Sequence, residues 1–138
     1  MILKIFTDGA ARGNPGQSAS GFDIYFENKL EKSFVKYNNI NTNNFAEYTA
    51  IIFALKWCKK NINKDDEIEI YSDSLLIISQ INHRFKVKAK NLLILNTQVQ
   101  ELKSHFKKIK FIHVNRTNKE IIGIDRKLNL FLDKKISK

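Results

Sequence analysis

Apolar residues recur along the chain in short runs that predict strands. The first run covers Ile2–Thr7, and two more follow at Ser20–Glu27 and Leu30–Tyr37. The two-residue connection between the second and third runs favours an antiparallel hairpin. Glu67–Ser72 and Lys110–Val114 have the same apolar character, so five strands are expected in all.

The segments between and after the later strands predict helices. The strongest pattern begins at Asn43 or Asn44, either of which can cap the free amides of a first turn, and runs to Asn61. Three further helices are expected at Ser74–Asn82, Asn91–Phe106 and Ile124–Lys135. Strands joined by helices add in parallel through right-handed crossovers. The sequence therefore predicts an α/β fold, with a five-stranded mixed sheet of three antiparallel and then two parallel strands, flanked by helices.

Polar stretches separate these elements and are expected to be loops. Gly9–Gly16 is rich in glycine and holds the only proline, and Asn38–Asn44 shows no core-forming periodicity. His83–Lys90, which we call the basic connector, alternates lysine with small or apolar residues.

Length and charge narrow the class of protein. At 138 residues with 43% hydrophobic content, the chain is expected to form one domain over residues 1–138, and we expect a monomer. The 24 lysines and arginines exceed the 14 acidic residues and give a formal net charge of +10, which favours binding to a polyanion such as nucleic acid. A single cysteine and the lack of a leader or a long apolar stretch predict an intracellular, cytoplasmic protein without a membrane span.

Three carboxylates lie at positions where a functional site is expected. Asp8 and Asp73 each close an apolar run, and ligands gather at the carboxyl ends of strands in open α/β sheets. Glu47 shares a helical stripe with Ile51 and Ala54, and a carboxylate on such a face is costly unless it is paired or holds a cation. These three residues therefore predict a shared metal or proton-transfer site. For Glu47, a first-turn acid favoured by the helix dipole is the competing interpretation.

Four segments, in order along the chain, resemble the signature set of the ribonuclease H family, type 1 branch. They are Thr7–Gly16, Thr42–Glu47, Tyr71–Ser74 and His113–Arg116. The resemblance covers essentially the whole chain and implies a compact form without a hybrid-binding domain. It implies an endoribonuclease that hydrolyses the RNA strand of an RNA/DNA hybrid and leaves 5′-phosphate and 3′-hydroxyl ends.

The same resemblance implies how the carboxylates act. Asp8 would bridge two Mg²⁺ ions, Glu47 and Asp73 would each add a ligand, and Mn²⁺ could substitute. Clustered carboxylates suit hard cations, and two such ions can activate water and stabilise the leaving oxygen.

Relatives carry a fourth carboxylate in an Asn-x-x-Ala-Asp pattern at the start of the last helix, and here that pattern is disturbed. Asn118 is followed by an apolar run before Asp125, which predicts a short insertion in the preceding loop. We assign the role to Asp125 rather than Glu120, because the first turn of a helix fixes a carboxylate better than a loop does. An ordinary first-turn acid at Asp125 is the alternative.

Candidate contacts to the nucleic acid follow from the resemblance and from charge. Glycine permits close approach of the backbone to a sugar-phosphate chain, and amide side chains can donate to and accept from 2′-hydroxyls. Arg116 can stabilise phosphate but cannot shuttle a proton near neutral pH. The predicted contacts are Gly9, Asn14, Thr42, Asn43, Asn44, Arg116, Lys86 and Lys88. The alternatives are a plain tight loop for Gly9 and Asn14, helix capping for Asn43 or Asn44, and a merely solvated face for the lysines.

A second function stays open at this point. The disturbed segment before Asp125 favours a catalytically impaired module of the same fold that binds RNA/DNA hybrid or structured RNA.

Overall fold

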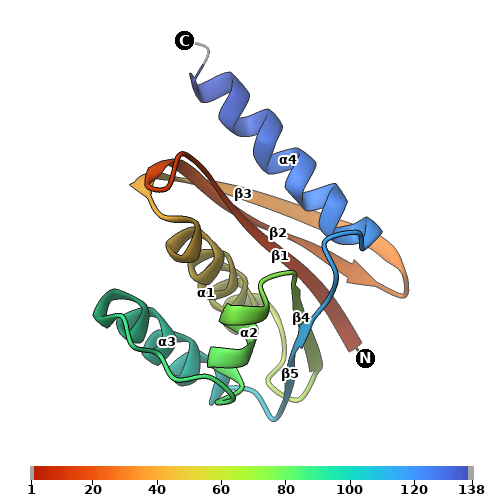
Figure 1. Cartoon of the computed structure of the whole chain (residues 1–138). Helices are drawn as coiled ribbons and strands as arrows, with labels where there is room; N and C mark the ends of the chain where they lie inside the picture. The colour runs from red at the N-terminus through yellow and green to blue at the C-terminus, as the bar shows by residue number, and fades with distance from the viewer. Residues whose placement is uncertain (1, 137–138) are drawn as a thin grey trace.

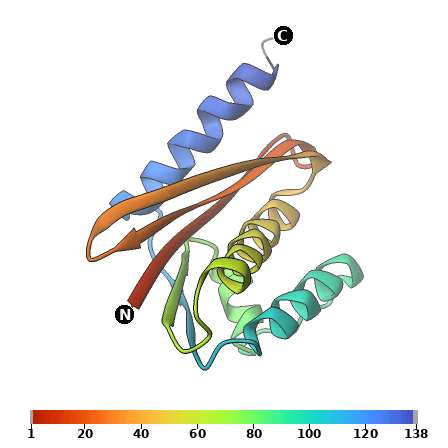
Figure 2. The same cartoon turned by 180° about the vertical axis from the view of Figure 1, so that it is seen from behind.

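A five-stranded sheet with helices on both faces forms the molecule in the computed structural model, which describes residues 2–136 (Figures 1 and 2). The strand order is β3-β2-β1-β4-β5. The strands are β1 (Ile2–Arg12), β2 (Gly16–Phe26), β3 (Lys29–Asn41), β4 (Glu67–Ser72) and β5 (Lys108–His113). β1, β2 and β3 pair antiparallel, whereas β4 and β5 add in parallel on the other side of β1. The predicted α/β architecture is confirmed.

The helices divide between the two faces of this sheet (Figure 1). α1 (Asn43–Asn61), α2 (Leu75–Ile81) and α3 (Lys90–Lys103) lie on one face, and α4 (Lys119–Ile136) crosses the other. The main hydrophobic core lies beneath α1, and a smaller cluster on the opposite face joins Ala19 of β2 to Leu128 and Leu132 of α4. No helix within residues 2–136 is long and apolar enough to cross a lipid bilayer.

The prediction of a loop at Gly9–Gly16 is wrong for most of that segment. β1 continues to Arg12 because its residues keep pairing with β2, from Asp8 opposite Gly21 to Arg12 opposite Gln17. Only a tight turn around Gly13 remains, where φ of +92° suits a residue without a Cβ.

The predicted loop Asn38–Asn44 is also mostly strand, since β3 extends to Asn41. The helix that follows is capped by neither asparagine. The Thr42 hydroxyl accepts a hydrogen bond from the Phe45 amide at 3.1 Å and caps α1 instead.

The short insertion predicted before Asp125 is not a loop. α4 begins at Lys119, and the Asn118 carboxamide oxygen accepts from the amides of Glu120 and Ile121 at 3.0 Å each. The apolar residues after Asn118 form the first turns of this helix. Asp125 therefore lies in the second turn, and the first-turn acid is Glu120.

Candidate metal centre

Asp8 and Asp73 come together because β1 and β4 are parallel neighbours. The last paired residues are Phe6 and Tyr71, and two residues further on each strand stand Asp8 and Asp73. Asp8 is buried within β1, and Asp73 lies partly buried directly after β4. Both carboxylates thus sit at the carboxyl end of the parallel strands, as the sequence predicted.

Glu47 reaches these carboxylates from α1 because Gly9 lets the helix approach β1. A Cβ at Gly9 would meet the backbone of Ala46 and Glu47, so no other residue fits without moving the helix. The Gly9 amide donates a hydrogen bond to the Glu47 carboxylate. On the next strand, the Ser20 hydroxyl donates to the Ala46 carbonyl at 2.6 Å. α1 is therefore bonded to β1 through Glu47 and to β2 through Ala46.

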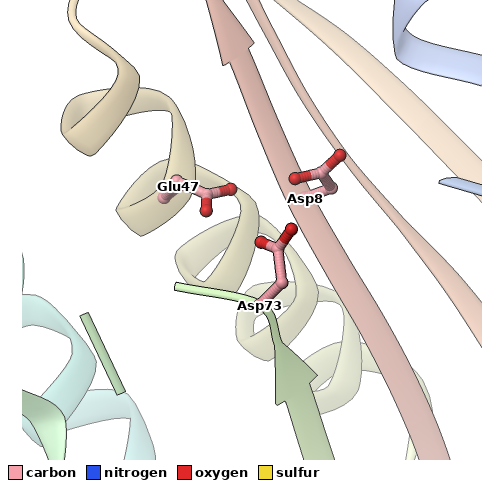
Figure 3. Close-up of side chains that lie close together, drawn as sticks. All are labelled: Asp8, Glu47 and Asp73. Carbon is pink, nitrogen blue, oxygen red and sulfur yellow. The ribbon is translucent and has the colours of Figure 1, made fainter. Parts of the chain in front are cut away.

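The three side chains converge on one point (Figure 3). One oxygen each of Asp8, Glu47 and Asp73 lies within 4.8 Å of the others. The first turn of α1 carries no acid, so the alternative interpretation of Glu47 as a first-turn acid is wrong. Asp125 lines the same open cavity from α4, together with Arg116.

Crowded negative charge dominates the electrostatics of this site. Burial, the charge of Glu47 and a hydrogen bond with Asp125 raise the pKa of Asp8 well above its usual value. Burial and the charge of Asp73 raise the pKa of Glu47 to about 8. Burial also raises the pKa of Asp73, against the opposing charge of Arg116. A divalent cation would relieve this repulsion, and a set of carboxylate oxygens is what a hard cation prefers.

The predicted asparagine contacts hold the turn after β1 against the start of α1. The Asn14 carboxamide oxygen accepts from the Asn43 amide at 3.0 Å, and the Asn43 carboxamide oxygen accepts from the Ala11 amide at 3.0 Å. Asn44 lines the cavity beside the carboxylates. Thr42 serves as the helix cap already described. The structure thus gives Thr42, Asn14 and Asn43 structural bonds, and their contact with nucleic acid stays a prediction.

The predicted lysine contacts lie apart from the carboxylates. Lys86 and Lys88 are exposed on the basic connector, and Lys86 lines a separate cavity with Phe85 and Leu93. Lys86 and the carboxylates therefore line two different cavities.

Glu120 does not reach the carboxylates either. It lines a different cavity, between the sheet and the start of α4, with Phe6 and Tyr25. The structure brings Asp125, and not Glu120, to the acidic cluster.

Sequence reasoning missed two residues that shape the site, Arg12 and Asn129. Asn129 lines the cavity, and Arg12 binds Asn129 across 117 positions of the chain. No local pattern signals a contact over that separation.

Comparison with known proteins supports one family. A family model described as RNase H matches residues 2–120. The bifunctional protein Rv2228c of Mycobacterium tuberculosis is 34% identical over 118 residues, which make up 84% of this chain and 32% of that protein. The ribonuclease H of Ehrlichia canis is 40% identical over 75 residues, 54% of this chain and 48% of that protein. The chain thus aligns with less than half the length of these curated relatives.

Solved structures match a larger share of this chain than the curated sequences do. The crystal structure of LC11-RNase H1, isolated from compost, in complex with RNA/DNA hybrid matches with a TM-score of 0.89 and 31% identity, over 97% of this chain and 99% of that one. The N-terminal RNase H domain of Rv2228c matches with a TM-score of 0.84 and 31% identity, over 94% and 97% of the two chains. Together with the family match over residues 2–120, these likenesses confirm the resemblance seen in the sequence: this chain belongs to the RNase H family.

Proposed function

We propose that this chain is a nuclease that hydrolyses the RNA strand of RNA/DNA hybrids in a reaction that needs divalent metal. The observation that carries the proposal is the convergence of Asp8, Glu47 and Asp73 within 4.8 Å at the carboxyl end of the parallel strands. Membership of the RNase H family and the likeness to an RNase H1 solved with bound hybrid support it.

The acidic cluster would hold two Mg²⁺ ions, with Mn²⁺ as a substitute. Asp8, Glu47 and Asp73 would each supply ligand oxygens, and Asp125 would contribute one from α4. When bound, the ions activate water for attack on phosphorus and stabilise charge on the leaving oxygen. Cleavage of the bond between phosphorus and the 3′ oxygen leaves 5′-phosphate and 3′-hydroxyl ends.

Arg116 supplies positive charge at the rim of this site. It lines the same cavity as Asp73, and its positive charge opposes the rise in the pKa of that carboxylate. A guanidinium keeps its proton at neutral pH, so its contribution is to attract and stabilise phosphate.

Asn14 and Asn43 are oriented to donate hydrogen bonds to the substrate. Each carboxamide oxygen is bound by a backbone amide, which fixes the orientation of the side chain. Within residues 2–136 their NH₂ groups have no hydrogen-bond partner, and both residues are exposed. The free donors suit acceptors on nucleic acid, including the 2′-oxygen that distinguishes RNA from DNA.

The proposal is tested by a cleavage assay that labels each strand separately. RNA/DNA hybrid, duplex RNA and duplex DNA are incubated with Mg²⁺ or Mn²⁺, and the ends of the products are identified. We expect cleavage of the RNA strand of the hybrid. EDTA should abolish this activity, and Asp8→Asn should remove most of it. Circular dichroism of the variant shows whether the fold is intact.

The same assay decides against the proposal if the hybrid stays whole with both metals or if Asp8→Asn cuts at the wild-type rate. Binding of hybrid without cleavage would instead identify a binding module. The disturbed segment that favoured such a module is continuous helix, so that argument no longer applies.

A further inference from the structure

Arg12, the last residue of β1, forms a directional link between the sheet and α4. Its Nη2 donates to the carbonyl oxygen of Asn129 at 3.1 Å and to the Asn129 Oδ1 at 3.0 Å. The same nitrogen lies 2.8 Å from Oδ1 of Asp133, one turn further along the helix. These contacts join the end of β1 to two consecutive turns of α4.

Asn129 connects this link to the metal centre. Its Nδ2 donates to the carbonyl oxygen of Asp125 at 3.0 Å, and its side chain lines the same cavity as Asp125. Because successive residues of a helix are turned by about 100°, Asn129 lies only about 40° around the axis from Asp125. Arg12 therefore holds the flank of α4 that carries Asp125.

The other contacts of α4 include apolar packing and an ion pair on the opposite flank. Leu128 and Leu132 attach the helix through apolar packing, which has no directional preference. The Lys127 ammonium forms an ion pair with the buried Asp23 carboxylate at 2.7 Å. Lys127, however, lies about 200° around the axis from Asp125, on the far flank.

Asp125 depends on the helix for its place because the residue is exposed. Packing confines an exposed side chain only weakly, so a small rotation of α4 would move its carboxylate away from Asp8. Apolar contacts tolerate such a rotation, whereas the contacts from Arg12 Nη2 would lengthen or bend if Asn129 and Asp133 moved.

We propose that Arg12 is a positioning residue, which sets the rotation of α4 through Asn129 and Asp133 and so brings the Asp125 carboxylate to Asp8. The inference rests on the proposed nuclease function as far as rate is concerned. Its structural part, the placement of Asp125 toward bound metal, can be measured without cleavage.

The test compares Arg12→Ala and Arg12→Lys with a control, Lys29→Ala. Lys29 begins β3, is exposed, and lies at the opposite end of the sheet, so its variant removes one positive charge from a distant site. We measure kcat and KM for hybrid, the Mg²⁺ concentration at half-maximal rate, and the Mg²⁺-induced shifts of backbone amide resonances at Asp125 and Asp73.

We expect Arg12→Ala to lower kcat about tenfold or more, since a misplacement of about 1 Å can cost a hundredfold. KM for hybrid should stay within about twofold, and the Mg²⁺ midpoint should rise. The Mg²⁺-induced shift should weaken at Asp125 and persist at Asp73. Arg12→Lys keeps the charge but replaces the rigid planar group by an ammonium on a flexible stem, so it should recover only part of the rate. Lys29→Ala should behave as wild type in every measurement.

Other results would overturn the inference. A rise in KM, with unchanged kcat and a flatter salt dependence of binding, would make Arg12 a phosphate contact. A lower unfolding temperature with an unchanged Mg²⁺ midpoint and unchanged shifts at Asp125 would make it merely structural. Should the wild-type protein fail to cleave hybrid, the proposed function fails, but the metal titration still decides the inference. A weakened shift at Asp125 in Arg12→Ala supports it, and an unchanged one overturns it.

Discussion

Replacing Gly9 by alanine tests whether close contact between β1 and α1 builds the acidic cluster. The new Cβ would lie 2.5 Å from the Ala46 carbonyl oxygen and closer still to two other backbone atoms of α1. Ordinary contact needs about 3.4 Å or more, so the helix would have to withdraw by about 1 Å. The helix resists, because the Ser20 hydroxyl holds the same carbonyl at 2.6 Å and itself accepts from the Asn38 side chain at 2.6 Å.

The expected magnitude follows from this displacement. Overpacking of a tight contact costs about 1–3 kcal/mol, which lowers the Tm of a domain of this size by several degrees. Glu47 moves with the helix and loses the hydrogen bond from the Gly9 amide. A displacement of about 1 Å at a catalytic group can reduce the rate about a hundredfold. Gly9→Ala should therefore lose far more activity than stability.

Urea unfolding and hybrid cleavage measure the two effects, with Gly123→Ala as the matched control. Gly123 lies inside α4, and a Cβ there would meet nothing within 4 Å. Alanine in a helix interior is favoured over glycine by about 0.5–1 kcal/mol, so this variant should be more stable than wild type. If Gly9→Ala unfolds within about 0.5 kcal/mol of wild type and cuts hybrid at the wild-type rate, the argument from close packing is refuted.

Three further predictions follow from the site and the charged surface. The raised pKa of Glu47 means that the folded, metal-free protein keeps a proton that the unfolded chain has released between about pH 4.5 and 8, so its stability falls as pH rises through that window. In EDTA, the stability of Glu47→Gln relative to wild type should accordingly increase from pH 4.5 to pH 8, and an unchanged difference would contradict this. Changing the three lysines of the basic connector to alanine should flatten the slope of log affinity for hybrid against log salt, by about 0.9 for each phosphate that the variant no longer neutralises. An unchanged slope would mean that these lysines form a solvated face without phosphate contacts. Asp125→Asn should lower the cleavage rate and raise the Mg²⁺ requirement while Glu120→Gln has little effect, and the opposite ranking would mean that Glu120 takes the fourth position.

The order of strands and the main acidic residues could be predicted because their signals are local. Asp8 and Asp73 end apolar runs, and Glu47 stands on the apolar stripe of a helix. The continuation of β1 beyond Asp8 has no such signal, since its residues are small or polar. What makes them strand is pairing with β2 across the turn.

The start of α4 was predicted too late for a related reason. Gly123 interrupts the apolar run and disfavours a helix in isolation. In the folded protein Ile121 and Ile124 are both buried, and this packing outweighs the weak propensity of one glycine. The Asn118 cap was visible in the sequence, but only tertiary packing decides whether the helix starts there or later. Interpreting these residues as an inserted loop places Asp125 in the wrong turn of the helix, although its side chain does line the cavity of the acidic cluster.

The separation of the two hydrophobic clusters affects how the site comes apart. Asp8, Glu47 and Asp73 belong to elements that flank the main core. Asp125 instead belongs to α4, which packs on the small cluster with Ala19. Cooperative units with little buried apolar surface open at a lower free energy than the whole molecule. We therefore expect α4 to open as a local unit more readily than the sheet and α1. Such an opening would withdraw Asp125 and leave the other three carboxylates in place, so we expect the local stability of α4 to set how often all four lie together.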